Sequence, residues 1–451
     1  MKIRFLILTT FLFRMVVYAQ EGPKTYTLRQ CIDYALVNNT SIKNATIDEY
    51  IAKSKVQEYK GTGLPQVTGS AALQQADPLR RIFGVGNGEY SFFANRVIPE
   101  GYIYSVPNVF QLSNTADASV TISQLLFSSS FFVGLKAANT YKELATRNKE
   151  NSQIQTIEAV TKAYYMVLIN TERKNIFDIN ISRVDSLLKQ TKVLNKSGFA
   201  ELLDVNRIEV TYNNLLTEKA NFENLVLLSS ILLKYQMNMP AGEEIGLSGK
   251  ISELTIDSAL SNSGKVDYTN RVEHKLLNTQ LKLEKLNYKN NSLGFLPTLA
   301  FNANVGTFSQ NTKLSFPTDR FAKYATYTLA LNVPIFSGFS RLRRVQQSRL
   351  SVEKAENNLK QFEKTVDLQT SSSEISYKNS IQSLNSQKRN MELAKEVARV
   401  TRIKYTSGVG SNIEVINAES SLKESQINYY NALYDALVQK VDYDKSQGNL
   451  K

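Results

Sequence analysis

The segment Ser-Gly-Phe-Ala-Glu-Leu-Leu-Asp-Val at residues 197–205 has a counterpart 210 residues later, Ser-Gly-Val-Gly-Ser-Asn-Ile-Glu-Val at residues 407–415. In each copy a Ser-Gly pair ends a long stretch without Gly or Pro, and an acidic residue followed by Val comes six residues after the glycine. Glycine suits a sharp reversal between two helices because it adopts a positive φ without steric strain. The two copies therefore predict two antiparallel helical hairpins.

The helices that lead into these turns are expected to be very long. Neither Leu135–Ser197 nor Phe339–Ser407 contains a Gly or Pro, and a helix over the second stretch would be about 100 Å long. Helices of this length are typical of coiled-coil packing rather than of a globular core. The helix after the second turn has two adjacent apolar seams, so we expect it to pack against a neighbour on each side. The two seams are Val415, Ala418, Leu422, Tyr429, Ala432 and Ala436, and Ile416, Ile427, Tyr430, Tyr434, Leu437 and Val441.

Other landmarks occur twice in the same order. Leu64-Pro65 has its counterpart at Leu296-Pro297, and Leu126-Phe127-Ser128 has its counterpart at Ile335-Phe336-Ser337. A duplication of this length predicts two internal structural repeats. The offset between the copies changes along the chain, which places the extra residues of the first copy at 75–115.

Four short segments follow a different period, because apolar residues alternate with small or polar ones over 67–74, 116–123, 299–306 and 326–333. This alternation is typical of membrane β-strands, although half-exposed hairpins share it. Open sheet edges cannot lie in lipid, and four strands are too few to close a barrel. Membrane strands would therefore require several copies of the chain, eight strands from two copies or twelve from three, and the pattern leaves both open.

The N-terminus predicts export. Lys2 and Arg4 precede an apolar run, and Val17 and Ala19 occupy the −3 and −1 positions of a cleavage site after residue 19. This pattern is typical of a secretory signal peptide over residues 1–19.

Composition argues against catalysis. The 451 residues include one Cys and one His, Cys31 and His274, which excludes a disulfide scaffold and a zinc site of the Cys/His type. We expect no metal or cofactor, and we expect His274, the one candidate histidine base, on a solvated helical face. The net charge of +13 is spread without a basic block, so nucleic-acid binding is not expected.

The landmarks together resemble the TolC family. Residues 27–40 (Thr-Leu-Arg-Gln-Cys-Ile-Asp-Tyr-Ala-Leu-Val-Asn-Asn-Thr), both Leu-Pro junctions, both Phe-Ser junctions and both Ser-Gly turns match in order along the mature chain. The resemblance implies a mainly α fold with membrane β-strands: an outer-membrane homotrimer whose twelve-stranded β-barrel, four strands per protomer, continues into a long helical coiled-coil barrel in the periplasm. It also implies an exit duct for a tripartite efflux pump or type I secretion system, with a periplasmic adaptor, an inner-membrane transporter and outer-membrane lipid as partners.

The resemblance implies a first repeat over 20–239 with a loop at 75–115 and a turn near 197–204, a linker over 240–267, and a second repeat over 268–451 with a loop at 309–324 and a turn near 407–414.

The resemblance further implies roles for residues at the turns. The periplasmic tips that dock the adaptor would include Gly198, Phe199, Gly408 and Val409. The constriction would include Glu414 and Asn417, and the gating links would include Tyr405 and Asp204. The family's gating arginine is replaced by Gly410, so we expect Arg402 or Arg207 to substitute for it.

Simpler interpretations stay open. Phe199 and Val409 could close their local turns, and Glu414 could be a solvated residue near a helix N-terminus. An exported coiled-coil filament or surface structural protein without a pore would also explain the long helices. A secreted hydrolase on a helical scaffold would need a catalytic cluster that the sequence does not contain.

Overall fold

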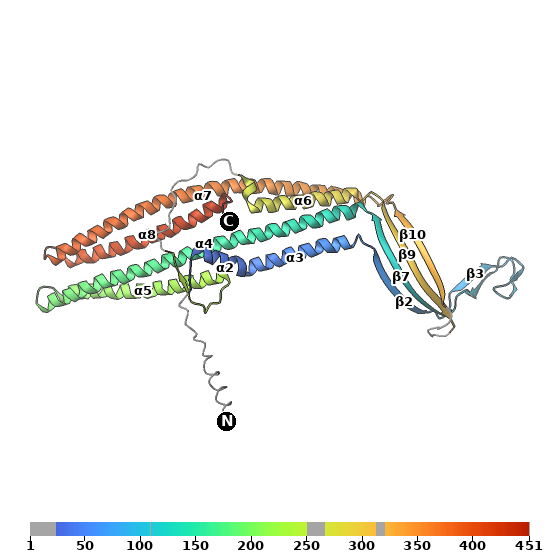
Figure 1. Ribbon diagram of the computed structural model, residues 1–451, viewed down its shortest axis with the longest axis horizontal. Helices are drawn as coiled ribbons and strands as arrows, with labels where there is room; N and C mark the ends of the chain where they lie inside the picture. The colour runs from blue at the N-terminus through green and yellow to red at the C-terminus, as the bar shows by residue number, and fades with distance from the viewer. Residues whose placement is uncertain (1–23, 109, 250–266, 313–320, 451) are drawn as a thin grey trace, which may run out of the picture. The chain divides into compact units, whose positions relative to one another are not determined.

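The computed structural model describes residues 24–108, 110–249, 267–312 and 321–450 (Figure 1). The expected signal peptide and residues 250–266 of the expected linker lie outside the described residues. The chain divides into two compact units, each built from separated stretches. The first unit comprises Met1–Glu49, Leu144–Thr279 and Asn357–Lys451, and the second comprises Tyr50–Glu143 and Gln280–Glu356.

The predicted long helices are present. Two helices exceed the others in length, α4 with 68 residues (Ser129–Lys196) and α7 with 67 residues (Ser340–Thr406). The other helices among the described residues are α2 (Leu28–Asn38), α3 (Thr40–Gly61), α5 (Leu202–Met237), η2 (Tyr268–Asn270), α6 (Val272–Leu293) and α8 (Asn412–Ser446). Among the described helices, none combines the length and the apolar character needed to cross a lipid bilayer.

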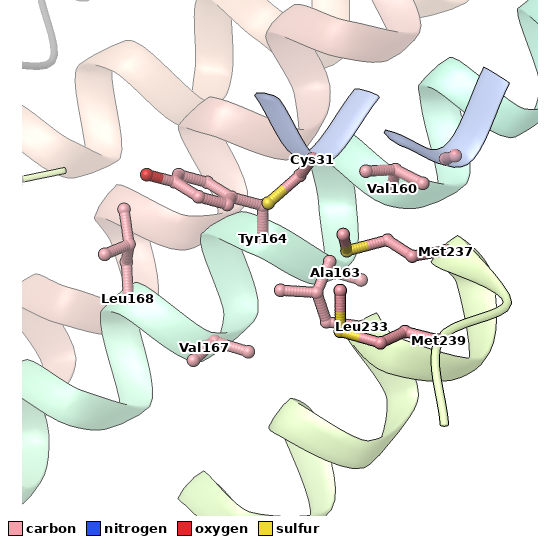
Figure 2. Close-up of a cluster of buried hydrophobic side chains, with 10 residues drawn as sticks. Cys31, Val160, Ala163, Tyr164, Val167, Leu168, Leu233, Met237 and Met239 are labelled. Atoms are coloured by element: carbon pink, nitrogen blue, oxygen red, sulfur yellow. The ribbon is translucent and has the colours of Figure 1, made fainter. Parts of the chain in front are cut away.

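The first unit holds a core at one end of α5. Thr27 and Gln30 form a capping box that starts α2, since the side chain of each accepts a hydrogen bond from the backbone N–H of the other. Figure 2 shows Cys31 of α2 among buried side chains of α4 and α5, including Val160 and Leu233. Burial raises the pKa of the Cys31 thiol to about 12, so this cysteine is a packing residue rather than a nucleophile. Beside this core the strands β1 (Lys24–Tyr26) and β8 (Ile245–Leu247) pair in parallel, so β8 lies in the expected linker.

Helix α8 packs on more than one side, as its two seams predict. Val415 lies in a buried cluster with Val205 and Ile208 of α5. Farther along α8, Ala436 and Leu437 pack with residues of α4 and α7 in another cluster. These contacts join the α4–α5 hairpin to the α7–α8 hairpin within the first unit.

The second unit contains the four predicted strands in one antiparallel sheet of order β10-β9-β7-β2 (Figure 1). The strands are β2 (Gln66–Gln75), β7 (Asn114–Phe127), β9 (Thr298–Asn311) and β10 (Ala322–Asn332). Val120 pairs with Gly69 and Val305, and Ala303 pairs with Ile122 and Tyr327. Because side chains alternate between the faces, this register puts all four predicted apolar sets on one face of the sheet.

The two segments that connect these strands differ from the expected loops. Residues 76–113 contain paired strands, because β3 (Arg81–Val85) pairs with β6 (Ile103–Pro107) and β4 (Tyr90–Ser91) pairs with β5 (Arg96–Val97). The other connection is shorter than the expected 309–324, since β9 continues to Asn311 and β10 begins at Ala322.

Candidate functional site

Two turns of the first unit join long helices: residues 197–201 connect α4 to α5, and residues 407–411 connect α7 to α8. Gly198 and Gly408 have φ angles of 81° and 77°, in the left-handed region that favours glycine. The N–H of the following residue donates to the carbonyl five residues earlier, at 2.8 Å for Phe199 and 3.0 Å for Val409. This bond is typical of a Schellman helix end, so the two turns close in the same way.

The expected docking residues lie at the apices of these turns. The side chains of Phe199 and Val409 are 83% and 79% exposed. Neither belongs to a hydrophobic cluster of the described residues, and backbone hydrogen bonds close both turns. Both side chains therefore lie where a partner protein could contact them.

Gly410 is tightly packed against the end of α7. A Cβ atom at this position would lie 2.9 Å from the backbone nitrogen of Tyr405 and 3.1 Å from the Cβ atom of Lys404. Any larger residue would have to displace the end of α7. The turn is built for glycine here, so a link between the hairpins must use other residues.

Glu414 and Asn417 lie on the exposed surface of the first turns of α8. Ser411 caps this helix, because its Oγ atom accepts a hydrogen bond from the backbone N–H of Glu414 at 3.3 Å. Residues three apart lie on the same side of a helix, and the positive end of the helix dipole favours the Glu414 carboxylate. The two predicted constriction residues therefore present one anionic and one neutral polar group on the same exposed face.

A cavity of about 1030 Å³ lies between the two turns, and Tyr405, Asp204 and Arg207 all line it. The Tyr405 hydroxyl lies 3.1 Å from the hydroxyl of Thr191 on α4. Asp204 accepts a 3.1 Å hydrogen bond from the Asn412 side chain through its backbone carbonyl, and its carboxylate lies 3.7 Å from Arg207. Both predicted gating residues thus line one cavity, but no hydrogen bond or ion pair of the described residues joins them: Tyr405 pairs with Thr191, and Asp204 pairs with Arg207.

A buried charged cluster joins three helices near these turns. Glu419 of α8 has a 6% exposed side chain, and its Oε1 atom lies 2.5 Å from Nη2 of Arg402 on α7. Its Oε2 atom lies 3.4 Å from Nε of Arg183 on α4. Burial lowers the pKa of the Arg183 guanidinium, Glu419 opposes that shift and Arg402 adds to it. One carboxylate thus lies between two guanidinium groups in what we call the Arg183–Glu419–Arg402 cluster.

The sequence pointed to Arg402 but not to its partners. Glu419 lies on the same side of α8 as the buried residues Val415 and Leu422. A carboxylate on an apolar seam is the signal that could have identified it, because buried carboxylates require partners. Thr191 offers no comparable signal, since a threonine on a long helix has no distinctive pattern.

Other ion pairs also join α8 to its neighbours. Lys423 lies 3.0 Å from both carboxylate oxygens of Glu218 on α5, and Lys445 lies 2.7 Å from Glu158 on α4. Burial alone would raise the pKa of Glu158, but hydrogen bonds from Lys162 and Lys445 outweigh it, so the pKa lies below its usual value.

The expectation of a solvated His274 is wrong. Its side chain is 12% exposed, Nε2 lies 3.4 Å from Glu363 of α7, and its ring stacks on Tyr268. These two neighbours cover the face that the helical spacing suggested was solvated. Within the described part of the chain, no group of three or more His, Cys, Asp and Glu side chains could hold a metal ion.

The chain is similar to outer membrane efflux proteins along most of its length. A family model described as "Outer membrane efflux protein" matches residues 274–448. The outer membrane protein TolC of Vibrio cholerae is 21% identical over 348 residues, which cover 75% of this chain and 78% of that protein. TolC of Escherichia coli is 20% identical over 440 residues, which cover 94% of this chain and 82% of that protein.

A solved structure shows the same fold. The CmeC outer membrane channel of Campylobacter jejuni matches with a TM-score of 0.74 at 14% identity, covering 94% of this chain and 86% of that one. The family match, the relatives and the fold agree with the resemblance seen in the sequence. Residues 274–448 thus match the outer membrane efflux protein family, and most of the chain resembles TolC-like channels in sequence and fold.

Proposed function

We propose that three copies of this chain form an exit duct through the outer membrane, with the helices in the periplasm. The duct would pass substrates outward from a tripartite efflux pump or a type I secretion system. Its two internal repeats would supply four strands per chain to a twelve-stranded barrel. It would act as a channel and not as an enzyme.

One observation carries this proposal: the register gathers the apolar residues of all four strands on one face of the sheet. An apolar face suits lipid, and a polar face suits a water-filled passage. The outer strands of this sheet are β2 and β10, and their free edges need partners from neighbouring copies if the sheet lies in a membrane.

The periplasmic entrance would lie at the two turns of the first unit. Glu414 from three chains would form a ring of carboxylates that attracts cations, with Asn417 beside it. The exposed Phe199 and Val409, held by the turns at Gly198 and Gly408, would dock the adaptor protein, which connects the duct to an inner-membrane transporter.

The closed entrance would be held by the Arg183–Glu419–Arg402 cluster, with Tyr405 and Asp204 contributing weaker links at the cavity. Two properties support this assignment. The cluster connects the α4–α5 hairpin to the α7–α8 hairpin, and it is less exposed than the ion pair between Arg207 and Asp204. Buried ion pairs are screened less by water and salt than exposed ones.

The mass of the complex extracted from outer membranes in detergent, with the bound detergent subtracted, tests the proposal. Three chains per particle and a water-filled conductance in planar bilayers are the expected results. Two chains would give an eight-stranded barrel and contradict the trimer. A soluble filament without conductance would favour the exported coiled-coil alternative.

A further inference from the structure

The polar face of the four-stranded sheet carries a carboxylate next to two aromatic rings. Asp117 of β7 pairs directly with Phe308 of β9, and the hydroxyl of Tyr324 on β10 donates to Asp117 Oδ2 at 3.0 Å. The ring centroids of Phe308 and Tyr324 are 6.2 Å apart. Alternation along the strands places all three side chains on the face opposite to Val120.

A glycine makes this arrangement possible. Tyr324 pairs with Gly306 in the register, and its side chain passes over that glycine to reach β7. A Cβ atom at Gly306 would lie 2.7 Å from Cζ of Tyr324 and 2.7 Å from the Cβ atom of Ser119. A side chain at position 306 would therefore push the tyrosine off the carboxylate, so three adjacent strands build the site together.

The charge of Asp117 stands alone on its face of the sheet. Among the residues of these four strands the other charged side chain is Lys323, and the register places it on the apolar face. Asp117 is partly exposed, and its carboxylate accepts a hydrogen bond from the hydroxyl of Tyr324. A hydroxyl group does not neutralise a carboxylate, so the site keeps a negative charge beside aromatic surface.

We propose that Asp117, Phe308 and Tyr324 form a binding site for organic cations on the wall of the passage. The inference rests on the proposed function, in which the polar face lines the passage. Aromatic rings attract cations, and the carboxylate adds Coulomb attraction. The combination favours a cation that carries apolar surface over an anion, a neutral molecule or a small hydrated metal ion. One site per chain gives three equivalent sites in the duct.

Ethidium, an aromatic organic cation, is the probe for this site. Its fluorescence anisotropy is measured with the full-length protein in lipid nanodiscs at low ionic strength. Asp117→Asn removes the charge and still accepts a hydrogen bond from Tyr324, and it should weaken ethidium binding about tenfold. Phe308→Leu, which keeps the charge, should weaken it by about threefold.

Glu100→Gln is the matched control, because it removes one carboxylate per chain from an exposed position of the segment 76–113. It should leave ethidium binding unchanged. Added salt should weaken binding to the wild type more than binding to Asp117→Asn, a difference that a purely structural role of Asp117 would not produce.

Equal binding by the wild type and Asp117→Asn would overturn the proposal, and so would an equal loss in Glu100→Gln. The same samples are checked for three chains per particle and for conductance. A conducting trimer that does not bind ethidium contradicts the cation site alone, whereas loss of the trimer or of conductance in the wild type contradicts the proposed function.

Discussion

Replacing Glu419 with Gln should favour the open entrance of the duct, because it leaves the two arginines of the cluster without their shared carboxylate. Breaking a buried ion pair costs about 3–5 kcal/mol. The Arg183 and Arg402 side chains are 24% and 33% exposed, so water screens part of this loss. We therefore expect Glu419→Gln to destabilise the closed state by about 1–3 kcal/mol per chain. That change lowers the ratio of closed to open states by roughly 5- to 150-fold per chain.

The assay is single-channel recording in planar bilayers, with the open probability and the conductance as readouts. Glu419→Gln should spend far more time in a high-conductance state than the wild type. The three-chain mass is measured on the same sample, so that a loss of assembly is not mistaken for a change of gating.

Glu396→Gln is the matched control. Glu396 pairs with Arg399 on the surface of α7, and both side chains are 59% exposed. The substitution removes the same charge from the same hairpin without separating two helices, so the open probability should stay at the wild-type value.

Wild-type gating in an intact Glu419→Gln trimer would refute the assignment of the cluster. If Glu419→Gln does not assemble, Arg183→Gln keeps the test open, because it breaks the contact between the two hairpins and leaves Glu419 paired with Arg402. This second variant should also raise the open probability, since it removes the link from α8 to α4.

The remaining predictions concern four other parts of the chain. Val120→Arg and Leu329→Arg each place a charge on the apolar face of the sheet. Each should destabilise the barrel in the membrane by about 2–4 kcal/mol at mid-bilayer depth and reduce the yield of trimer from outer membranes. Glu414→Gln should weaken cation preference, measured as a reversal potential across a salt gradient, and unchanged selectivity would remove Glu414 from the constriction. The pKa of Glu158 is lowered in the folded state, so its charge contributes stability near neutral pH that is lost on acidification. Glu158→Gln should therefore lower the thermal unfolding temperature more at pH 7 than at pH 3. Phe199→Ser should weaken co-purification of the adaptor without changing the yield of trimer.

The sequence predicted the helices and strands well where one strong local pattern decides the structure. The stretch without Gly or Pro that begins at Leu135 predicted a long helix, and α4 contains nearly all of it. The helix begins earlier, at Ser129, because Gly134 does not break it. The side chain of Tyr59 occupies the space beside Gly134, so this glycine serves close packing between helices. Composition alone does not distinguish such a glycine from one that ends a helix.

The composition of the segment 76–113 did not reveal its internal strands. Its many Gly, Pro and aromatic residues indicated a loop; the segment does connect β2 to β7, but it also contains the paired strands β3–β6 and β4–β5. Gly84 lies in β3 beneath the ring of Tyr104, so the glycine allows a close contact between strands rather than a flexible turn. Glycine within a strand often marks such a close approach.

The contacts of the candidate site could not be predicted for a different reason. Tyr405 and Thr191 are 214 residues apart, and Glu419 meets Arg183 across two different hairpins. Such pairs depend on the rotation of each helix about its axis, and a shift of one residue turns a side chain by about 100°. The periodicity of an apolar seam fixes which face is buried, but it does not identify the polar partner on the next helix.

In the proposed duct, docking of the adaptor and opening of the entrance would be separate steps. Gly410 leaves no side chain for a strong link at the turn, and the nearby ion pair between Arg207 and Asp204 is partly exposed and 3.7 Å long. Exposed pairs of this kind contribute about 0–1 kcal/mol, so an adaptor that contacts Phe199 meets little resistance at the apex. The more buried contact, between Glu419 and Arg183, breaks only when α4 moves away from α8. We therefore infer that Phe199→Ser weakens adaptor binding but leaves the open probability of the isolated duct unchanged. Glu419→Gln, in contrast, should raise that open probability without an adaptor. A change of open probability in Phe199→Ser would contradict the separation of docking from opening.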